Sequence, residues 1–297
     1  MAKRRWTVSP PTRSFWRVPA RHCAMLEFEF MRHAFLAAAA VALLCGPVGW
    51  FLVLRGQSFA GHALSHIAFA GATGAVLIGI APLLGMTLAA GLAGIALGWE
   101  APAGTPRASR FTSGRDSATG LVLAASLGVG TLFLQWSNAP SSSATALLFG
   151  NVLGVNRLTL LLLGGLTTTG ILALAVIARP LLFVSLDPDM AAARGAPVRL
   201  VSVAFMVLVA LSSAVCAEVT GILLAFSLLV GPAATMLRLG LAPWPGALGA
   251  ALLALGLAWS GLALSWWTDA PVSFWIAALA ALTYFAARFY CGRCQSI

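Results

Sequence analysis

The chain has 297 residues, of which 60% are hydrophobic and only 9% are charged. A soluble domain carries roughly 25% charged residues, so this composition excludes a water-soluble fold and indicates an integral membrane protein. The formal net charge of +10 does not indicate nucleic-acid binding, because the basic residues lie in the first 32 residues and in short gaps between apolar runs. Arginines in such gaps are typical of the cytoplasmic face of a membrane.

Lysine usage excludes nucleotide chemistry by the chain itself. A Walker A loop needs a lysine after a glycine-rich turn to hold the β- and γ-phosphates of ATP. The only lysine is Lys3, near the N-terminus. We therefore expect no enzymatic activity, and any ATP hydrolysis must be supplied by a separate subunit.

Long apolar runs follow one another along most of the chain. A membrane-spanning helix needs about 20 such residues to cross the hydrocarbon core. Runs of this kind lie at 34–54, 59–80, 83–99, 117–136, 158–178, 200–237, 247–267 and 272–288. The run at 200–237 is too long for one crossing and is interrupted by Glu218 and Gly221. Since backbone hydrogen bonds in lipid must be satisfied within each segment, the sequence predicts an all-α polytopic helix bundle with about 8–9 transmembrane helices.

Three regions are expected along the chain. A basic N-terminal extension over 1–30 is expected to be disordered, a transmembrane domain covers 31–290, and a short cytoplasmic tail covers 291–297. The arginine-rich gaps at 107–115 and 179–199 are expected to face the cytoplasm, and so is the C-terminus.

An odd number of crossings then places the N-terminus outside, which conflicts with the basic extension. The extension is not a signal peptide, because prolines follow its charges where an apolar region should begin. We expect natural translation to start at Met25 or Met31.

Two histidines provide the clearest chemistry. His62 and His66 are four residues apart, so on a helix they lie on one face, about one turn apart. Two imidazoles at this spacing can bind one metal ion, and imidazole suits zinc whereas carboxylate suits manganese better. An alternative of equal weight is that both histidines make ordinary hydrogen bonds near a membrane interface.

Other polar residues are weaker candidates for a metal site. Glu218 could line a polar path, but the position between two apolar runs favours a turn. Asp269 precedes Pro271 and is expected in a turn as well. The CxxC spacing of Cys291 and Cys294 supplies only half of a zinc site, and nothing nearby completes it.

At the string LVLRGQSFAGHALSHIAFAG the sequence resembles the zinc/manganese permease family of ABC importers. The positions that match the family pattern are Arg55, Gly61, Ser65, His66 and Gly71. Two positions depart from it: His62 stands where the family usually has aspartate, and Ala70 where it often has proline. Further similar strings lie at 115–130, 147–155, 187–197, 221–235 and 269–273. Their order and spacing extend the resemblance from about residue 30 to 288.

The resemblance implies a fold similar to that of the vitamin B12-type ABC importer permeases. It implies a multi-pass subunit of the bacterial plasma (inner) membrane, surrounded by lipid, that pairs with a second copy of itself. Two cytoplasmic ATPase subunits would dock on it, and a periplasmic or surface metal-binding protein would deliver the ion. No cofactor would be permanently bound, because Zn²⁺, or Mn²⁺ or Fe²⁺, is the cargo.

The resemblance also assigns roles to residues. His66 becomes a ligand of the transported ion, and His62 occupies the place of the aspartate. A His/His pair favours zinc and makes binding sensitive to pH, because both rings must be neutral to coordinate. Glu218 and Asp269 rank lower as metal ligands. Contact with the ATPase is expected around residues 235–244, including Thr235 and Arg238.

The same architecture could carry manganese, iron or a larger metal chelate. A metal-dependent membrane enzyme is less favoured, since the sequence has no HExxH motif and lacks the several histidine clusters of a membrane di-iron hydroxylase.

Overall fold

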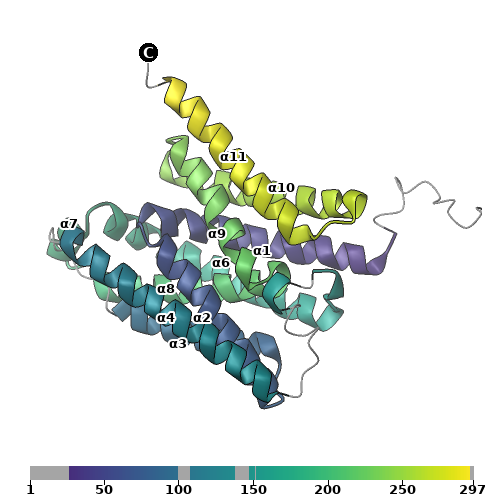
Figure 1. Ribbon diagram of the computed structural model, residues 1–297. Coiled ribbons are helices and arrows are strands. Elements are labelled where there is room, and N and C mark those ends of the chain that lie inside the picture. The colour runs from purple at the N-terminus through teal and green to yellow at the C-terminus, as the bar shows by residue number, and fades with distance from the viewer. Residues whose placement is uncertain (1–26, 100–107, 138–146, 151, 295–297) are drawn as a thin grey trace, which may run out of the picture.

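The computed structural model describes residues 27–99, 108–137, 147–150 and 152–294, and over these ranges the chain is helical without strands (Figure 1). The long helices are α1 (Glu29–Leu54), α2 (Ser58–Leu77), α3 (Pro82–Trp99), α4 (Ala108–Trp136), α6 (Arg157–Leu186), α8 (Val198–Thr220), α9 (Ile222–Arg238), α10 (Pro243–Thr268) and α11 (Val272–Cys294). A 3-10 turn, η1 (Val152–Gly154), and a short helix, α7 (Pro188–Ala193), complete the described elements. The nine long helices agree with the predicted count.

Seven of these nine helices are long and apolar enough to cross a membrane. The other two are α2 and α9. α9 is the shortest of the nine, with 17 residues, and α2 carries two histidines, two serines and three glycines in its 20 residues. Each is partly shielded by neighbours, because α2 packs on α3, α4 and α8, and α9 packs on α1, α10 and α11. The less apolar helices are therefore held by protein contacts.

Several helix boundaries differ from the predicted ones. α4 begins at Ala108 although a polar gap was expected until Arg115, and α6 continues through Pro180 to Leu186. A charged residue at the end of a transmembrane segment need not stop a helix, because the helix can continue into water. The run at 200–237 divides at Gly221, whose φ of +83° ends α8 and starts α9, as predicted.

The last helix, α11, extends to Cys294. The predicted boundary between the transmembrane domain and the tail, at residues 290 and 291, stays a prediction. Most of the predicted extension at 1–30, including Met25, lies outside the described residues, so its disorder and the start site stay predictions.

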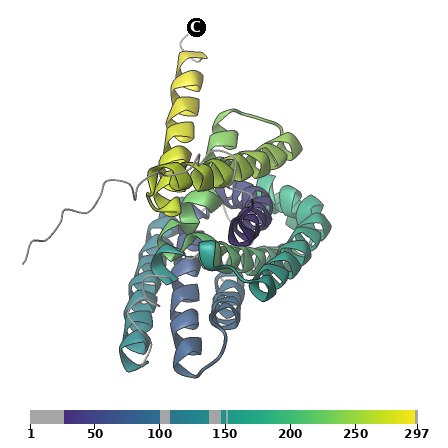
Figure 2. The same ribbon diagram turned by 90° about the vertical axis from the view of Figure 1, so that its right-hand side faces the viewer.

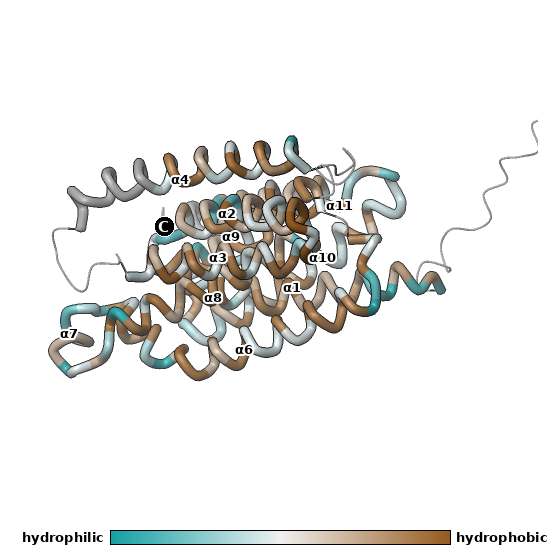
Figure 3. Tube along the Cα trace, turned by 90° about the horizontal axis from the view of Figure 1, so that it is seen from below, coloured by the Kyte–Doolittle hydropathy of each residue, from teal (hydrophilic) through white to brown (hydrophobic). Residues whose placement is uncertain are grey.

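α1 lies in the centre of the bundle. It packs against α10, α9, α6, α8 and α2, and Figure 2 shows it nearly end-on inside a ring of other helices. Helices α2, α3 and α4 form one flank, while α10 and α11 form another. Hydrophobic residues dominate the long helices, and hydrophilic residues gather at α7 and at the start of α1 (Figure 3).

Small residues bring the central backbones close together. A Cβ atom on Gly46 would lie 2.5 Å from the Ala251 nitrogen of α10, and one on Gly49 would overlap the Leu229 carbonyl of α9. Helix association in lipid depends on such close packing, because lipid tails are as apolar as leucine.

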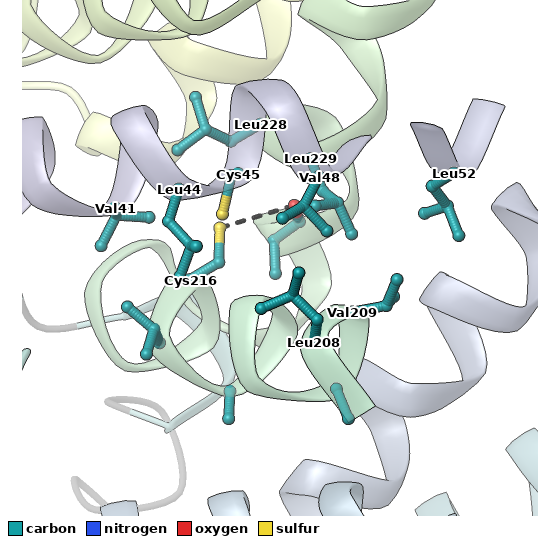
Figure 4. Close-up of a cluster of buried hydrophobic side chains, with 14 of the residues drawn as sticks. Val41, Leu44, Cys45, Val48, Leu52, Leu208, Val209, Cys216, Leu228 and Leu229 are labelled. Carbon is teal, nitrogen blue, oxygen red and sulfur yellow. Dashed lines mark hydrogen bonds between the residues drawn. The ribbon is translucent and has the colours of Figure 1, made fainter. Parts of the chain in front are cut away.

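The core between α1, α8 and α9 is filled by aliphatic side chains and two thiols (Figure 4). Cys45 and Cys216 are free and fully buried. The Cys45 thiol donates to the Ser212 carbonyl and the Cys216 thiol to the Ala225 carbonyl, both over 3.6 Å. The second bond links the end of α8 to the beginning of α9.

The two ends of the bundle differ in charge. At one end, Arg55 donates to the hydroxyls of Ser185 and Ser202 over 3.5 and 2.9 Å, and the Arg199 guanidinium lies 5.1 Å from the centre of the Trp99 ring. This arginine-rich end comprises the end of α1, the end of α3, the end of α6 and the start of α8. The positive-inside rule predicts that it faces the cytoplasm.

At the opposite end, Arg157 forms an ion pair with Glu29 at 3.3 Å, and Ser273 donates to the Phe149 carbonyl at 2.7 Å. The ion pair joins the starts of α1 and α6, and the hydrogen bond joins the start of α11 to the 147–150 segment. The predicted orientation therefore places this opposite end outside the cell.

Candidate metal-ion site

The two histidines of α2 lie side by side, as their spacing predicts. The ring centres of His62 and His66 are 4.7 Å apart and the ring planes are nearly perpendicular, at 88°. The His62 ring also packs against Phe226 of α9, with 5.1 Å between ring centres. His66 is 4% exposed, and His62 is half-buried. The pair is thus a polar feature inside the bundle, in contact with α9.

Neither imidazole makes a hydrogen bond within the described part of the chain. The Nδ1 atoms of both His62 and His66 are enclosed and have no partner. A buried polar group without a partner costs about 1–3 kcal/mol, so ordinary structural histidines would be expected to find one. Both rings are therefore free to bind a ligand, and their role as metal ligands stays a prediction.

A glycine positions the turn of α2 that carries the pair. A Cβ atom on Gly61 would lie 2.6 Å from Leu52 of α1 and 3.5 Å from Leu229 of α9. The Gly61 carbonyl accepts from Ser65 at 3.2 Å and from Ser213 of α8 at 3.5 Å. The backbone just before His62 is therefore held against three helices, which fixes where both imidazoles lie.

Two imidazoles supply only half of the four ligands that zinc usually takes. Among the described residues, no group of three or more His, Cys, Asp or Glu side chains is close enough to hold one ion. Within the described part of the chain, the pair therefore supplies two of the positions of a tetrahedral site.

The lower-ranked metal candidates lie elsewhere. Glu218 is on the last turn of α8, just before the break at Gly221, where the sequence predicts a turn. Asp269 adopts a left-handed conformation, with φ of 55°, in the connection between α10 and α11. Asp269 lines a cavity of about 560 Å³ with Ser265 and Trp266. The structure does not bring either carboxylate together with the histidine pair.

The predicted ATPase contact lies at the end of α9. Thr235 is buried and donates to the Gly231 carbonyl of its own helix at 2.8 Å, and Arg238 is the exposed last residue of α9. α9 runs from the end that holds Gly221 towards the arginine-rich end. The position suits a cytoplasmic contact, and the role of these two residues stays a prediction.

The sequence did not predict one contact of the site, and one predicted feature lies outside the described residues. The contact of Phe226 with His62 joins positions that are far apart in the chain, and no local pattern indicates it. The side chains of Cys291 and Cys294 lie outside the described residues, so their hypothetical metal or redox role is untested.

Comparison with known proteins agrees with this architecture. The sequence profile of the ABC 3 transport family matches residues 27–291. The manganese transport system membrane protein MntC of Halalkalibacterium halodurans is 30% identical over 211 residues, which cover 71% of this chain and 70% of that protein. The manganese import system permease protein ScaB of Streptococcus parasanguinis is 30% identical over 209 residues, covering 70% and 72%.

Two solved structures share the fold. PsaBC from Streptococcus pneumoniae, in complex with Fab, superposes with a TM-score of 0.77 at 23% identity, covering 89% of this chain and 92% of that one. An inward-facing metal-chelate type ABC transporter superposes with a TM-score of 0.62 at 18% identity, covering 88% and 86%. The chain therefore belongs to the ABC 3 transport family and is the multi-pass permease subunit of a bacterial plasma-membrane importer of divalent metal ions.

Proposed function

We propose that this permease imports zinc and that His62 and His66 are ligands of the transported ion. The observation that carries the proposal is the pair of adjacent imidazoles, largely enclosed by the bundle and free of hydrogen bonds. Ionisable side chains inside a membrane bundle usually mark an ion path, because they are costly unless they have a function.

The choice of zinc follows from the ligand type. Two neutral imidazoles suit zinc, whereas a carboxylate beside an imidazole suits manganese better. His62 stands where this family usually has aspartate, so the site has less negative charge. Water or a second copy of the chain would complete the tetrahedral coordination that zinc prefers.

Energy and delivery come from partners under this proposal. A separate ATPase subunit docks at the arginine-rich end, with Thr235 and Arg238 near the contact, and a second permease copy completes the pathway. A metal-binding protein docks at the opposite end and delivers the ion. The single lysine of the chain, Lys3, supports the need for an external ATPase.

Manganese is the second candidate cargo. The names of the relatives from Halalkalibacterium halodurans and Streptococcus parasanguinis both specify manganese. Those names describe the relatives, and the His/His pair of this chain is the reason to place zinc first. Iron and a metal chelate remain further options for the same architecture.

Uptake measurements test the proposal. The chain is expressed with its cognate ATPase and binding protein in cells that lack their own zinc importer, and uptake of zinc and of manganese is followed. We expect His66→Ala to abolish zinc uptake and His62→Asp to shift preference towards manganese. His33→Ala is the control, because His33 lies near the start of α1 beside Glu29 and outside the pair. Normal zinc uptake by His66→Ala would show that the ligands lie elsewhere.

A further inference from the structure

A groove between α9 and α11 begins beside the histidine pair. It has a volume of about 420 Å³ and is open on one side. Its lining residues are Val53, Ser58, Phe226, Ser227, Val230, Gly231, Ala234, Ala277, Ala280, Ala281, Tyr284 and Phe285. Phe226 belongs both to this lining and to the contact with His62, so the groove and the pair share a side chain.

The groove points towards the arginine-rich end. Along α9 its lining runs from Phe226 to Ala234, four residues before the end of that helix. Along α11 the lining runs from Ala277 to Phe285, in the same direction as the helix continues towards the C-terminus (Figure 1). A path along the groove therefore leads from the level of the histidines to the end predicted to face the cytoplasm.

Small residues keep the groove open. Glycine and alanine supply five of its lining positions, and a Cβ atom on Gly231 would meet the Cβ atom of Ala280 at 3.0 Å. The two helices therefore touch behind the groove, while the short side chains beside this contact leave space in front of it. A bulky side chain at one of these positions would fill that space.

Three hydroxyl groups in the groove have no hydrogen-bond partner among the described residues: those of Ser58, Ser227 and Tyr284. Most other serines in the bundle donate to a carbonyl of their own helix, for example Ser212 to Leu208 at 2.8 Å. Hydroxyl groups can hydrogen-bond the water molecules of a hydrated ion. A set of weak neutral contacts suits a route, because an ion must be able to leave each position as well as enter it.

We propose that this groove is the release route by which the ion leaves the His62–His66 pair for the arginine-rich end. The proposal rests on the proposed function of the pair. The lining contains no arginine or lysine, so a divalent cation meets no repulsive side chain within the groove. The hydroxyls of Ser58, Ser227 and Tyr284 hold the waters of the ion as it moves.

A blocking variant tests the route. Ala281→Trp places an indole in the groove, and the neighbouring Leu282→Trp is the matched control, because Leu282 is 64% exposed and does not line the groove. Zinc uptake is measured in cells, and zinc binding is measured on the purified complex by equilibrium dialysis. We expect Ala281→Trp to lower uptake by about tenfold or more while zinc binding is unchanged, and Leu282→Trp to change neither. Normal uptake by a well-expressed Ala281→Trp would overturn the proposal.

A second measurement keeps the test decisive if the tryptophan variant fails to fold. Ser227→Cys and, as control, Leu282→Cys are made with the other accessible cysteines replaced by serine. A small hydrophilic thiol reagent is added to inside-out vesicles. We expect labelling of Ser227→Cys that zinc slows, and no labelling of Leu282→Cys with or without zinc, because Leu282 is exposed on a membrane-spanning helix and faces lipid. If Ser227→Cys is not labelled, or if zinc does not slow its labelling, the route is wrong.

The two proposals fail in different ways. If His66→Ala removes zinc binding but Ala281→Trp transports normally, only the route is wrong. If His66→Ala binds and transports zinc normally, the pair is not the ion site, whatever the groove does.

Discussion

Helices α1 and α6 have the same mean hydropathy in their most apolar segments but opposite positions in the bundle. In those 18-residue segments, 67% of residues are buried in α1 and 22% in α6. α1 packs against five other long helices, whereas α6 leaves large side chains such as Leu161 and Leu172 at the surface, 74% and 66% exposed. Hydropathy identifies both as membrane helices and does not tell which one is central.

What distinguishes the two helices is the contact that their small residues make. Gly46 and Gly49 of α1 lie directly against the backbones of α10 and α9, while Cβ atoms on Gly164 and Gly165 of α6 would meet nothing within 4 Å. In lipid the hydrophobic effect does not pull helices together, so close backbone packing takes its place. The two glycines of α1 thus meet the backbones of other helices, whereas of the three glycines of α6 only Gly170 meets another helix, and it meets side chains alone.

The largest expected effect comes from filling this contact. Gly49→Leu would force a side chain into the Leu229 carbonyl of α9, and we expect loss of the folded protein, a cost above about 4 kcal/mol. Gly164→Leu is the matched variant on α6 and should be neutral or stabilising by up to about 1 kcal/mol, since glycine is a poor helix former. The yield of monodisperse protein and its melting temperature in detergent measure both. Equal stability of the two variants would show that glycine contacts do not define the centre.

A smaller effect is expected from removing side-chain volume. Leu44 of α1 is fully buried, and Leu172 of α6 is 66% exposed. Leu44→Ala should cost about 2 kcal/mol, at the lower end of the range for buried leucines, because in a membrane protein mainly the packing contribution is lost. Leu172→Ala should stay within about 0.5 kcal/mol. Melting temperatures in detergent check the difference, and similar losses at both sites would contradict the assignment of α6 to the periphery.

Glycines in the connections between helices also differ in how closely other backbone atoms approach them. Gly221 and Gly240 both have positive φ, +83° and +66°, but only Gly221 is crowded, with Phe149 and Gly150 against it. Gly240→Ala should cost about 1 kcal/mol for the left-handed backbone alone. Gly221→Ala should cost about 2–3 kcal/mol, because the new methyl group also displaces the 147–150 segment. Equal losses in melting temperature would show that crowding at Gly221 is relieved without cost.

Much of the fold could be predicted from the sequence for a physical reason. Each membrane helix must satisfy its own backbone, so apolar length alone indicates the number of helices and the division near Gly221. The i, i+4 spacing of His62 and His66 also determines that their rings meet, because helix geometry is local. The central position of α1 could not be predicted in this way, since it depends on which glycines meet other backbones.

The surroundings of the histidine pair could not be predicted from the sequence either. Phe226 and Ser213 come from α9 and α8, far along the chain from α2, and their contacts depend on how these helices cross. Helix ends were also misjudged at Arg115 and Pro180, because charges and prolines near the membrane surface are compatible with a continuing helix.

The smallest effect on stability is expected from removing single hydrogen bonds. At the arginine-rich end a bond between two helices can be compared with a bond within one helix. Ser202 of α8 is buried and accepts from Arg55 at 2.9 Å, whereas Thr168 of α6 is exposed and donates only to carbonyls of its own helix. Ser202→Ala removes a hydrogen bond between α1 and α8. The loss should cost about 1 kcal/mol, which is modest for a bond to a charged group, because Arg55 keeps its bonds to Gln57 and Ser185. Thr168→Ala should cost nothing measurable. A melting-temperature loss for Thr168→Ala as large as that for Ser202→Ala would mean that hydrogen bonds between helices add no more stability than those within one, and glycine contacts alone would then separate the centre of the bundle from its edge.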